Sequence, residues 1–328
     1  MRQTRIKISA DEGPAVYHCV TRTVNGEWLL DDVAKEVLRK QLWQIAEYCG
    51  VQIVTYAILS NHFHVLIRVP KRQEVSDAEL MRRYAILYPR PSRYQMTKLH
   101  IIKTDLERGG PEAIAWRKRQ LALMSDVSQF MKLLKQRFSI WFNKSHQRFG
   151  TLWAERFKSV LVEDRDHVLQ TIAAYIDLNA VRAGLTTDPK DYRFCGYAEA
   201  IAGNQFAQLG IRSVTSGDWK QAQAHYRELL FGTGAAARDG NASISAEDLQ
   251  RVMQQGGILS HAAVLRCRLR FFSDGAVLGS RVFVALHLAR FLKTSAPPKP
   301  KSPQSLPVYT KWGDLATMRR VRLRYSSG

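Results

Sequence analysis

The chain has 328 residues, enough for one large domain or two smaller ones, and its 45% hydrophobic content is typical of a globular protein. Lysine and arginine (49) outnumber aspartate and glutamate (29), and the net charge of +20 favours a polyanionic partner, because each cation that meets a phosphate releases counterions. The sequence shows no secretion signal and no run near the roughly 18 apolar residues of a membrane helix, which argues against an exported or membrane-spanning protein. Its four cysteines show no CxxC spacing, which argues against a zinc ribbon. We therefore expect a cytoplasmic protein.

The N-terminal part predicts a strand followed by a helix. Residues 16–21 are rich in β-branched and aromatic side chains, which is typical of a strand. Apolar residues at helical spacing then predict a helix that Asp31 or Asp32 caps and that runs to about Tyr48. We expect Gly50 to end this helix.

A hairpin and an insertion are expected next. Residues 51–59 and 63–69 predict two strands joined by a very short turn, and therefore an antiparallel hairpin. Residues 71–124 are charged and rich in arginine, and the segments 89–91 and 109–111 contain prolines and glycines that break any long element. We expect this insertion to form short helices or loops at the periphery of the sheet.

The middle of the chain predicts a helix, a strand and a second helix. The first helix begins near Ser125, and the strand covers 156–163. Asp164 or Asp166 is expected to cap the second helix, which runs to about Arg182. The resulting order, β-α-β-β-α-β-α, resembles a split βαβ sheet layered with helices.

The composition divides the chain into four parts. Residues 1–200 hold the predicted sheet, and 201–243 are expected to be a linker. Residues 244–293 predict a small helical region whose arginines favour a DNA-binding role. The tail, 294–328, is rich in proline and arginine and is expected to be disordered unless bound.

His62 and His64 stand one residue apart on the predicted strand. Side chains alternate between the two faces of a strand, so both imidazoles lie on one face. Two imidazoles held side by side on a rigid strand suit a divalent metal. An ordinary surface or core role is the alternative for each histidine.

Tyr175 and Asn179 are four residues apart on the predicted second helix, and therefore lie on one helical face. Apolar residues flank this face, so packing with the tyrosine hydroxyl at the water edge is the simplest role for Tyr175. Asn179 by itself would be a surface residue or a hydrogen-bonding residue at the end of the helix.

A stretch of alternating rings and cations precedes the last predicted strand. It contains Phe149, Trp153 and Phe157 together with Arg148, Arg156 and Lys158. Rings that stack on bases and cations that bind phosphates are what a single strand or a hairpin needs. The alternative is that Trp153 and Phe157 belong to the core and that the cations are solvated.

Four segments together resemble the single-tyrosine HUH endonucleases, and more specifically the REP-associated tyrosine transposases and their insertion-sequence relatives. They are residues 59–64, 148–158, 175–184 and 191–194. The resemblance spans roughly residues 13 to 200. Two departures are Ala180, where family members often have proline, and the length of the insertion, so DNA contacts there cannot be carried over.

The resemblance implies an α+β fold with a ferredoxin-like antiparallel sheet and a specific chemistry. His62, His64 and Asn179 would hold Mg²⁺ or Mn²⁺, and the position of Asn179 varies between Gln and Asn in the family. Tyr175 would attack a phosphodiester and form a 5′-phosphotyrosine. The candidate residues for binding nucleic acid are Arg148, Trp153, Arg156, Lys158 and Arg182.

The expected function is a metal-dependent DNA transposase that cleaves and rejoins single-stranded or hairpin DNA, including repeated extragenic palindromes. The protein would act as a monomer or homodimer at the nucleoid. One alternative is a catalytically silent DNA- or RNA-binding protein of the same fold, and another is a metal-dependent hydrolase that uses water. Intact His62, His64 and Tyr175 favour the transposase.

Two chemical points remain open at the level of sequence. The base that would deprotonate the nucleophile is not identified, although Glu163 and Asp164 are near in sequence. Histidines bind metals in their neutral form, so activity is expected to fall as the pH drops through roughly 6 to 6.5.

Overall fold

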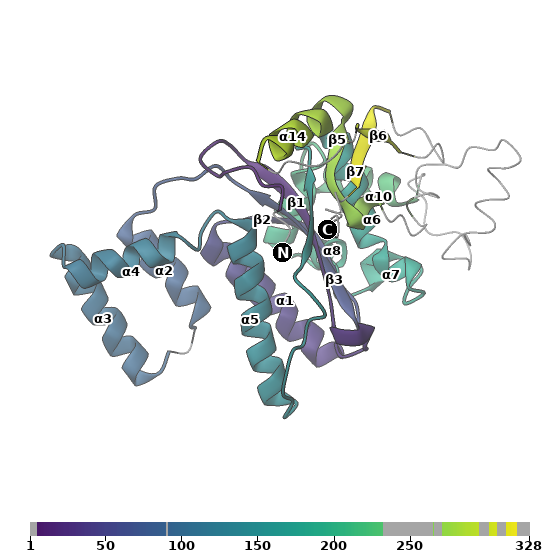
Figure 1. Cartoon of the computed structure of the whole chain (residues 1–328). Coiled ribbons are helices and arrows are strands. Elements are labelled where there is room, and N and C mark those ends of the chain that lie inside the picture. The colour runs from purple at the N-terminus through teal and green to yellow at the C-terminus, as the bar shows by residue number, and fades with distance from the viewer. Residues whose placement is uncertain are drawn as a thin grey trace, which may run out of the picture.

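A computed structural model describes residues 5–89, 91–231, 265, 271–294, 302–306 and 313–319. These residues form a seven-stranded sheet with strand order β2-β3-β1-β4-β5-β7-β6 (Figure 1). The strands are β1 (Ala15–Arg22), β2 (Gln52–Ile58), β3 (His62–Val69), β4 (Lys158–Val162), β5 (Gly275–Ser280), β6 (Gln304–Ser305) and β7 (Leu315–Arg319). No helix among the described residues is long and apolar enough to cross a membrane.

The first four strands form the predicted split βαβ sheet. β1 lies in the middle and pairs antiparallel with β3 on one side and β4 on the other, while β2 pairs antiparallel with β3. The two crossover helices are α1 (Asp32–Cys49) and α5 (Val127–Ser145). This arrangement confirms the mixed fold with an antiparallel sheet and packed helices.

The alternation of side chains along the strands gives the sheet two different faces. Tyr17, Phe63 and Val65 pack in the same core cluster as the buried side chains of α1 and α5. Val16 and Leu66 pack on the opposite face in the cluster that contains α6 (Asp166–Asp177). Because His62 and His64 have the parity of Leu66 on β3, both histidines belong to the α6 face.

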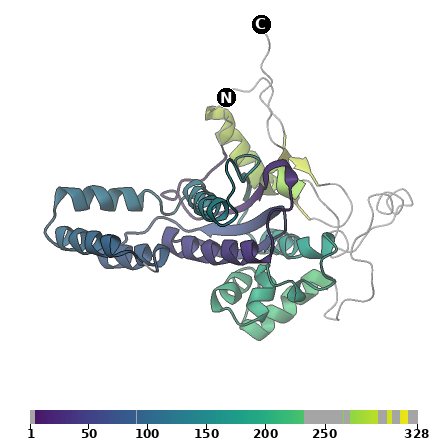
Figure 2. The same ribbon diagram turned by 90° about the horizontal axis from the view of Figure 1, so that it is seen from below.

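The insertion forms three helices that project from the sheet, which Figure 2 shows in blue. They are α2 (Asp77–Leu87), α3 (Arg93–Glu107) and α4 (Pro111–Leu121). Ser76 caps α2, and Ser92 forms a capping box with Gln95 at the start of α3. Pro111 occupies the first turn of α4, where its missing N–H costs nothing.

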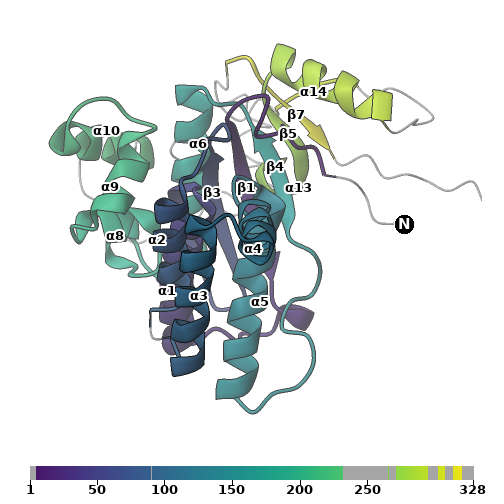
Figure 3. The same cartoon turned by 90° about the vertical axis from the view of Figure 1, so that its left-hand side faces the viewer.

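The expected linker is wrong over its described part. Residues 205–231 form α9 (Gln205–Arg212) and α10 (Trp219–Phe231), which follow α8 (Gly196–Ile201), and residues 232–243 lie outside the described structure. Asn204 caps α9 through its side chain. Ile211 and Tyr226 are fully buried in the α6-side core, which gives these helices a tertiary reason to form. Figure 3 shows α8, α9 and α10 gathered on one side of the sheet.

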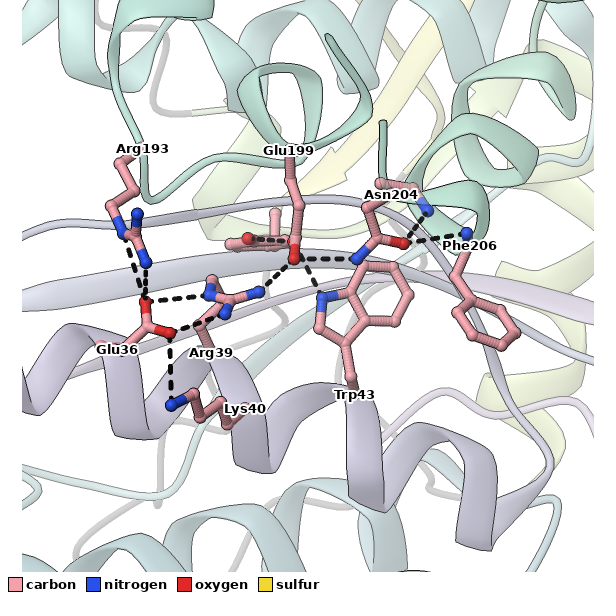
Figure 4. Close-up of polar contacts among 10 residues, drawn as sticks. Glu36, Arg39, Lys40, Trp43, Arg193, Glu199, Asn204 and Phe206 are labelled. Carbon is pink, nitrogen blue, oxygen red and sulfur yellow. Dashed lines mark hydrogen bonds and ion pairs between the residues drawn. The ribbon is translucent and has the colours of Figure 1, made fainter. Parts of the chain in front are cut away.

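A buried carboxylate attaches this helical group to the sheet and to α1 (Figure 4). Glu199 on α8 accepts hydrogen bonds from Arg39, from Trp43 Nε1 at 2.8 Å and from Tyr56 at 2.5 Å. Asn204 Nδ2 donates to the same carboxylate at 2.9 Å. These bonds join α1, β2, α8 and the turn before α9, so a single side chain holds four parts of the fold together.

The C-terminal expectations need correction. Residues 244–264 and 266–270 lie outside the described structure, and β5 is a strand within the segment that was expected to be helical. The tail contains β6 and β7, so its described part is not disordered. β5 runs parallel to β4, and β7 pairs antiparallel with both β5 and β6. Val277 and Met318 are buried in the sheet, which explains why short strands form beside prolines and arginines.

The remaining described helices are η1 (Val24–Gly26), η2 (Pro189–Asp191), α7 (Asn179–Arg182), α13 (Phe271–Asp274) and α14 (Arg281–Thr294).

Candidate active site

The predicted histidine pair lies at the beginning of β3. His62 and His64 lie with ring centroids 5.3 Å apart and ring planes at 74°. His64 is buried, with 5% of its surface exposed, whereas His62 is partly exposed. The pair therefore reaches from the interior of the α6-side core to its edge.

α6 brings the predicted tyrosine to the same place. The Tyr175 ring lies 6.4 Å from the His64 ring, measured between centroids, with the two planes at 83°. Tyr175 and both histidines line one cleft of about 730 Å³. Residues more than a hundred positions apart in sequence thus meet on one face of the sheet, as predicted.

Asn179 also lines this cleft, although the helix that carries it is not continuous. α6 ends at Asp177, and α7 (Asn179–Arg182) starts after Leu178, so the predicted single helix is broken there. Asn179 Nδ2 donates to the Ile176 carbonyl at 3.0 Å. This bond leaves the amide oxygen as the group that Asn179 can offer to a ligand.

The hydrogen bonds of the histidines favour metal binding through Nε2. His62 Nδ1 lies 2.6 Å from Asn61 Oδ1, an oxygen that accepts, so Nδ1 carries the proton and the lone pair is on Nε2. Burial lowers the pKa of His64 well below its ordinary value of 6.5, with His18 as the next cause. His64 therefore stays neutral at a lower pH than the sequence predicted. We expect the loss of activity that follows from protonation of His64 to occur below pH 6 to 6.5.

The donors present fit a divalent ion that accepts mixed nitrogen and oxygen ligands. His62, His64 and Asn179 could supply two neutral imidazoles and an amide oxygen, and this set leaves positions for water or phosphate. Within the described part of the chain, no group of three or more His, Cys, Asp or Glu side chains is arranged to hold a metal. The amide oxygen is therefore needed to complete the set.

Arg182 takes a different position from a simple phosphate ligand. Its guanidinium carbon lies 4.0 Å from the centroid of the Tyr175 ring. The same group donates to the carbonyl oxygens of Tyr175 at 2.5 Å and of Leu265 at 2.6 Å. Although Arg182 lines the cleft, these contacts place it where it can hold the tyrosine in position.

The other predicted nucleic-acid residues divide into two groups. Arg156 and Lys158 line the cleft, where phosphates could reach them. Arg148 lies outside the cleft lining, and its guanidinium is 3.6 Å from the Glu27 carboxylate. Trp153 is buried, packs against Phe63 with ring centroids 5.8 Å apart, and cannot stack on a base. The core alternative is therefore correct for Trp153.

The two acidic residues considered as bases are engaged elsewhere. Glu163 accepts from the backbone N–H of Ser280 at 2.6 Å and from its hydroxyl at 3.0 Å. Asp164 accepts two hydrogen bonds from Arg68. Neither residue lines the cleft, whereas Glu155 does.

Residues 14–90 match the model of the family described as Transposase IS200 like. This segment of the chain is similar to the IS200-like transposases. A solved structure of a REP-associated tyrosine transposase bound to a REP hairpin is also similar, with 14% identity and a TM-score of 0.34 over 67% of this chain and 93% of that chain. No curated protein matches the chain.

The IS200-like segment confirms the predicted resemblance over the residues that it covers. It contains His62 and His64 and ends inside the insertion. Tyr175 and Asn179 lie beyond it, so their assignment depends on the geometry of the cleft and on the sequence motif that contains them.

The sequence analysis did not identify His18, which lies on β1 beside His62 and His64. Its Nε2 is 2.9 Å from His64 Nδ1, and it is fully buried. His18 shares the α6 face with His64 because β1 pairs with β3. The parity of residue 18 within the predicted strand was the available signal, but the order of the strands in the sheet was needed to use it.

Proposed function

We propose that the protein is a metal-dependent transposase that cleaves and rejoins single-stranded or hairpin DNA through a 5′-phosphotyrosine at Tyr175. The observation that carries the proposal is the meeting of His62, His64 and Tyr175 in one cleft, with the tyrosine ring 6.4 Å from the His64 ring. The match of residues 14–90 to the IS200-like transposases supports it independently of that geometry.

The charge of the cleft supports a nucleic-acid substrate. Arg22, Arg156 and Lys158 line it beside the histidines, and the whole chain carries a net charge of +20. Cations that surround a nucleophile can hold the phosphates on both sides of a scissile bond. The choice of single-stranded or hairpin DNA follows from the family resemblance.

The proposed chemistry keeps the energy of the broken bond. The Tyr175 oxygen would attack the phosphorus, and the departing 3′ oxygen would leave as a free 3′-OH. A bound divalent ion would supply charge stabilisation at the phosphate oxygens. His62, His64 and Asn179 would hold that ion, while Arg182 would keep the tyrosine ring in place. Attack by a 3′-OH on the phosphotyrosine would then rejoin the strand.

The direct test is to trap the covalent intermediate. The full-length protein is incubated with 5′- or 3′-labelled single-stranded oligonucleotides taken from the DNA that flanks its own gene, and SDS-resistant adducts are counted. We expect an adduct that retains the strand 3′ of the cut, that requires Mg²⁺ or Mn²⁺ and that disappears in Tyr175→Phe. Tyr48→Phe is the matched control, because Tyr48 is a buried tyrosine on the opposite face of the sheet.

Two results would contradict the proposal in different ways. Cleavage that survives Tyr175→Phe would indicate a hydrolase that uses water. Retention of DNA without any adduct, in protein that binds the metal, would indicate a binding protein with a silent site.

A further inference from the structure

His18 lies between a backbone carbonyl and the buried histidine of the candidate site. Its Nδ1 is 2.8 Å from the carbonyl oxygen of Phe272, and its Nε2 is 2.9 Å from His64 Nδ1. The two imidazoles are stacked, with centroids 5.1 Å apart and planes at 23°. His18 is fully buried and is not among the residues that line the cleft.

The hydrogen-bond partners determine where the protons are. A carbonyl oxygen only accepts, so His18 Nδ1 carries a proton and donates it to Phe272. A neutral imidazole has one N–H, so His18 Nε2 then has a lone pair and accepts from His64 Nδ1. His64 consequently carries its proton on Nδ1, and its Nε2 has the lone pair.

The surroundings of His18 agree with a neutral ring. His18 is fully buried, and its two ring nitrogens contact a backbone carbonyl oxygen and the ring of His64, with no carboxylate among these two partners. Burial of a charge without a counter-charge is unfavourable, so His18 holds a single ring proton.

We propose that His18 is a positioning residue that fixes the tautomer and the ring orientation of His64, so that His64 Nε2 faces the metal. This inference rests on the proposed metal site, and it assigns a role to a residue outside the ligand set. A ligating histidine is commonly oriented by the group that its other nitrogen contacts, and loss of such a group typically weakens metal binding 10- to 100-fold. Here a second histidine would play that part.

The chain of hydrogen bonds makes the C-terminal segment a part of the site. His18 and Phe272 are 254 positions apart in sequence. The Phe272 ring also packs on Tyr175, with centroids 4.9 Å apart. The segment that leads into β5 thus contacts both the proposed nucleophile and the residue that orients the proposed ligand.

The test reads the tautomers in the full-length protein without metal and without DNA. The protein is labelled with ¹⁵N-histidine, and long-range ¹H–¹⁵N spectra at pH 7.5 assign the protonated nitrogen of each ring. We expect His18 and His64 both to carry the proton on Nδ1. A proton on Nε2 of His64 in the wild-type protein would overturn the proposal without any variant.

Three variants separate positioning from packing. His18→Leu removes the acceptor, and we expect the His64 proton to redistribute to Nε2 and the Kd for Mn²⁺ to rise roughly 10- to 100-fold. His18→Gln places an amide oxygen near the former Nε2 position and should restore most of the affinity. His287→Leu is the control, because His287 is also buried but lies on α14, on the other face of the sheet. Equal Mn²⁺ affinity in His18→Leu and the wild type would overturn the proposal.

The outcome is independent of the adduct assay. If the tautomers and the Mn²⁺ affinities behave as expected but no Tyr175 adduct forms, the positioning role is correct and the transposase proposal fails. If the adduct forms and His18→Leu changes neither tautomer nor affinity, the positioning role alone fails. A thermal melt of each variant shows whether Leu or Gln unfolds the protein, and the wild-type spectrum remains decisive if Leu does.

Discussion

Asp177 is a buried carboxyl group two residues from the proposed nucleophile, and it points away from the cleft. It accepts from the Thr55 hydroxyl at 2.8 Å, from the Tyr226 hydroxyl at 2.6 Å and from the Tyr197 backbone N–H at 3.2 Å. These bonds attach α6 to β2, α8 and α10. Asp177 therefore holds the helix that carries Tyr175 against the sheet.

The pKa of Asp177 predicts how stability depends on pH. Burial raises this pKa from 3.8 to about 6, although the three hydrogen bonds lower it in part. The folded state thus favours the protonated acid, and the resulting stabilisation is complete below the unfolded pKa and is lost as the pH rises through about 6. Asp177→Asn does not titrate. We expect the unfolding free energy of the wild type minus that of Asp177→Asn to decrease by up to about 3 kcal/mol between pH 4 and pH 7.5.

Urea unfolding of both proteins at several pH values measures this difference. Effects of the other titrating groups cancel, since both proteins share them. A difference that is constant, or that grows with pH, would show that Asp177 is not held in a raised-pKa environment.

Single residues also show what the sequence could predict. The face shared by His62 and His64 followed from strand alternation alone, and that part was correct. Trp153 was ambiguous because a segment in which rings and cations alternate has the same sequence pattern whether the rings stack on bases or pack in the core. His18 was not predictable, because its partner lies on a neighbouring strand and a third group comes from Phe272.

At the scale of elements, the junction between α6 and α7 determines how Tyr175 and Asn179 face each other. Arg182 at the end of α7 spans this junction through its bond to the Tyr175 carbonyl. Its second bond, to Leu265, connects the junction to the C-terminal part of the chain. A guanidinium can donate to two carbonyls at fixed angles and stack on a ring, which an ammonium cannot do.

We predict that Arg182→Lys lowers the rate of adduct formation at saturating DNA by roughly tenfold, because one charge-assisted hydrogen bond and the stacked position are lost. The affinity for DNA should change much less, because the positive charge is kept. Rate and affinity are measured separately, by single-turnover adduct formation and by fluorescence anisotropy. Arg212→Lys on α9 is the control. Weakened binding with an unchanged rate would instead make Arg182 a DNA contact.

The elements of the first two hundred residues were largely predictable, since their apolar periodicity is strong and their connections are local. The break at Leu178 was not, because no proline or glycine marks it. β6 and β7 were missed for a related reason. They have two and five residues, and they form through pairing, β7 with β5 and β6 with β7, rather than from their own composition.

At the scale of the whole molecule, exposed aromatic side chains lie near the cationic cleft. Phe149 is 94% exposed, and its neighbour Arg148 contacts Glu27, which precedes Trp28, a residue that is 80% exposed. The segments that contain Trp28 and Phe149 lie near the end of the sheet that carries His62. They are held there in part by Asn61, which donates to the Gly26 carbonyl at 3.0 Å. Exposed rings next to phosphate-binding cations are suited to stacking on unpaired bases.

We predict that Phe149→Ala and Trp28→Ala each weaken binding of a hairpin with a single-stranded extension by roughly 5- to 160-fold, since stacking of one base on a ring contributes about 1–3 kcal/mol. Binding of the same hairpin without the extension should change little. Competition binding at fixed salt measures both affinities. Phe206→Ala, an exposed ring on α9 labelled in Figure 4, is the control. Equal losses for both DNAs would argue against stacking on the extension.

The overall charge predicts a polyanionic partner. The split βαβ pattern predicted the arrangement of the first four strands correctly. The extension of that sheet by β5, β7 and β6 could not be predicted from composition. Because Phe272 contacts both His18 and Tyr175, this extension also changes how the site is held. Such contacts join residues up to 254 positions apart in sequence, and they form only once the strands of the sheet are in place.

The most direct measurement is to identify the residue that is bonded to DNA. The adduct formed with a cleavable oligonucleotide is digested with protease and nuclease, and the modified peptide is sequenced by mass spectrometry. We predict one nucleotide-bearing peptide, with the phosphate of the 5′ end on Tyr175. A phosphate on any other residue, or cleaved DNA with every peptide unmodified, would contradict the assignment of Tyr175 as the nucleophile of this site.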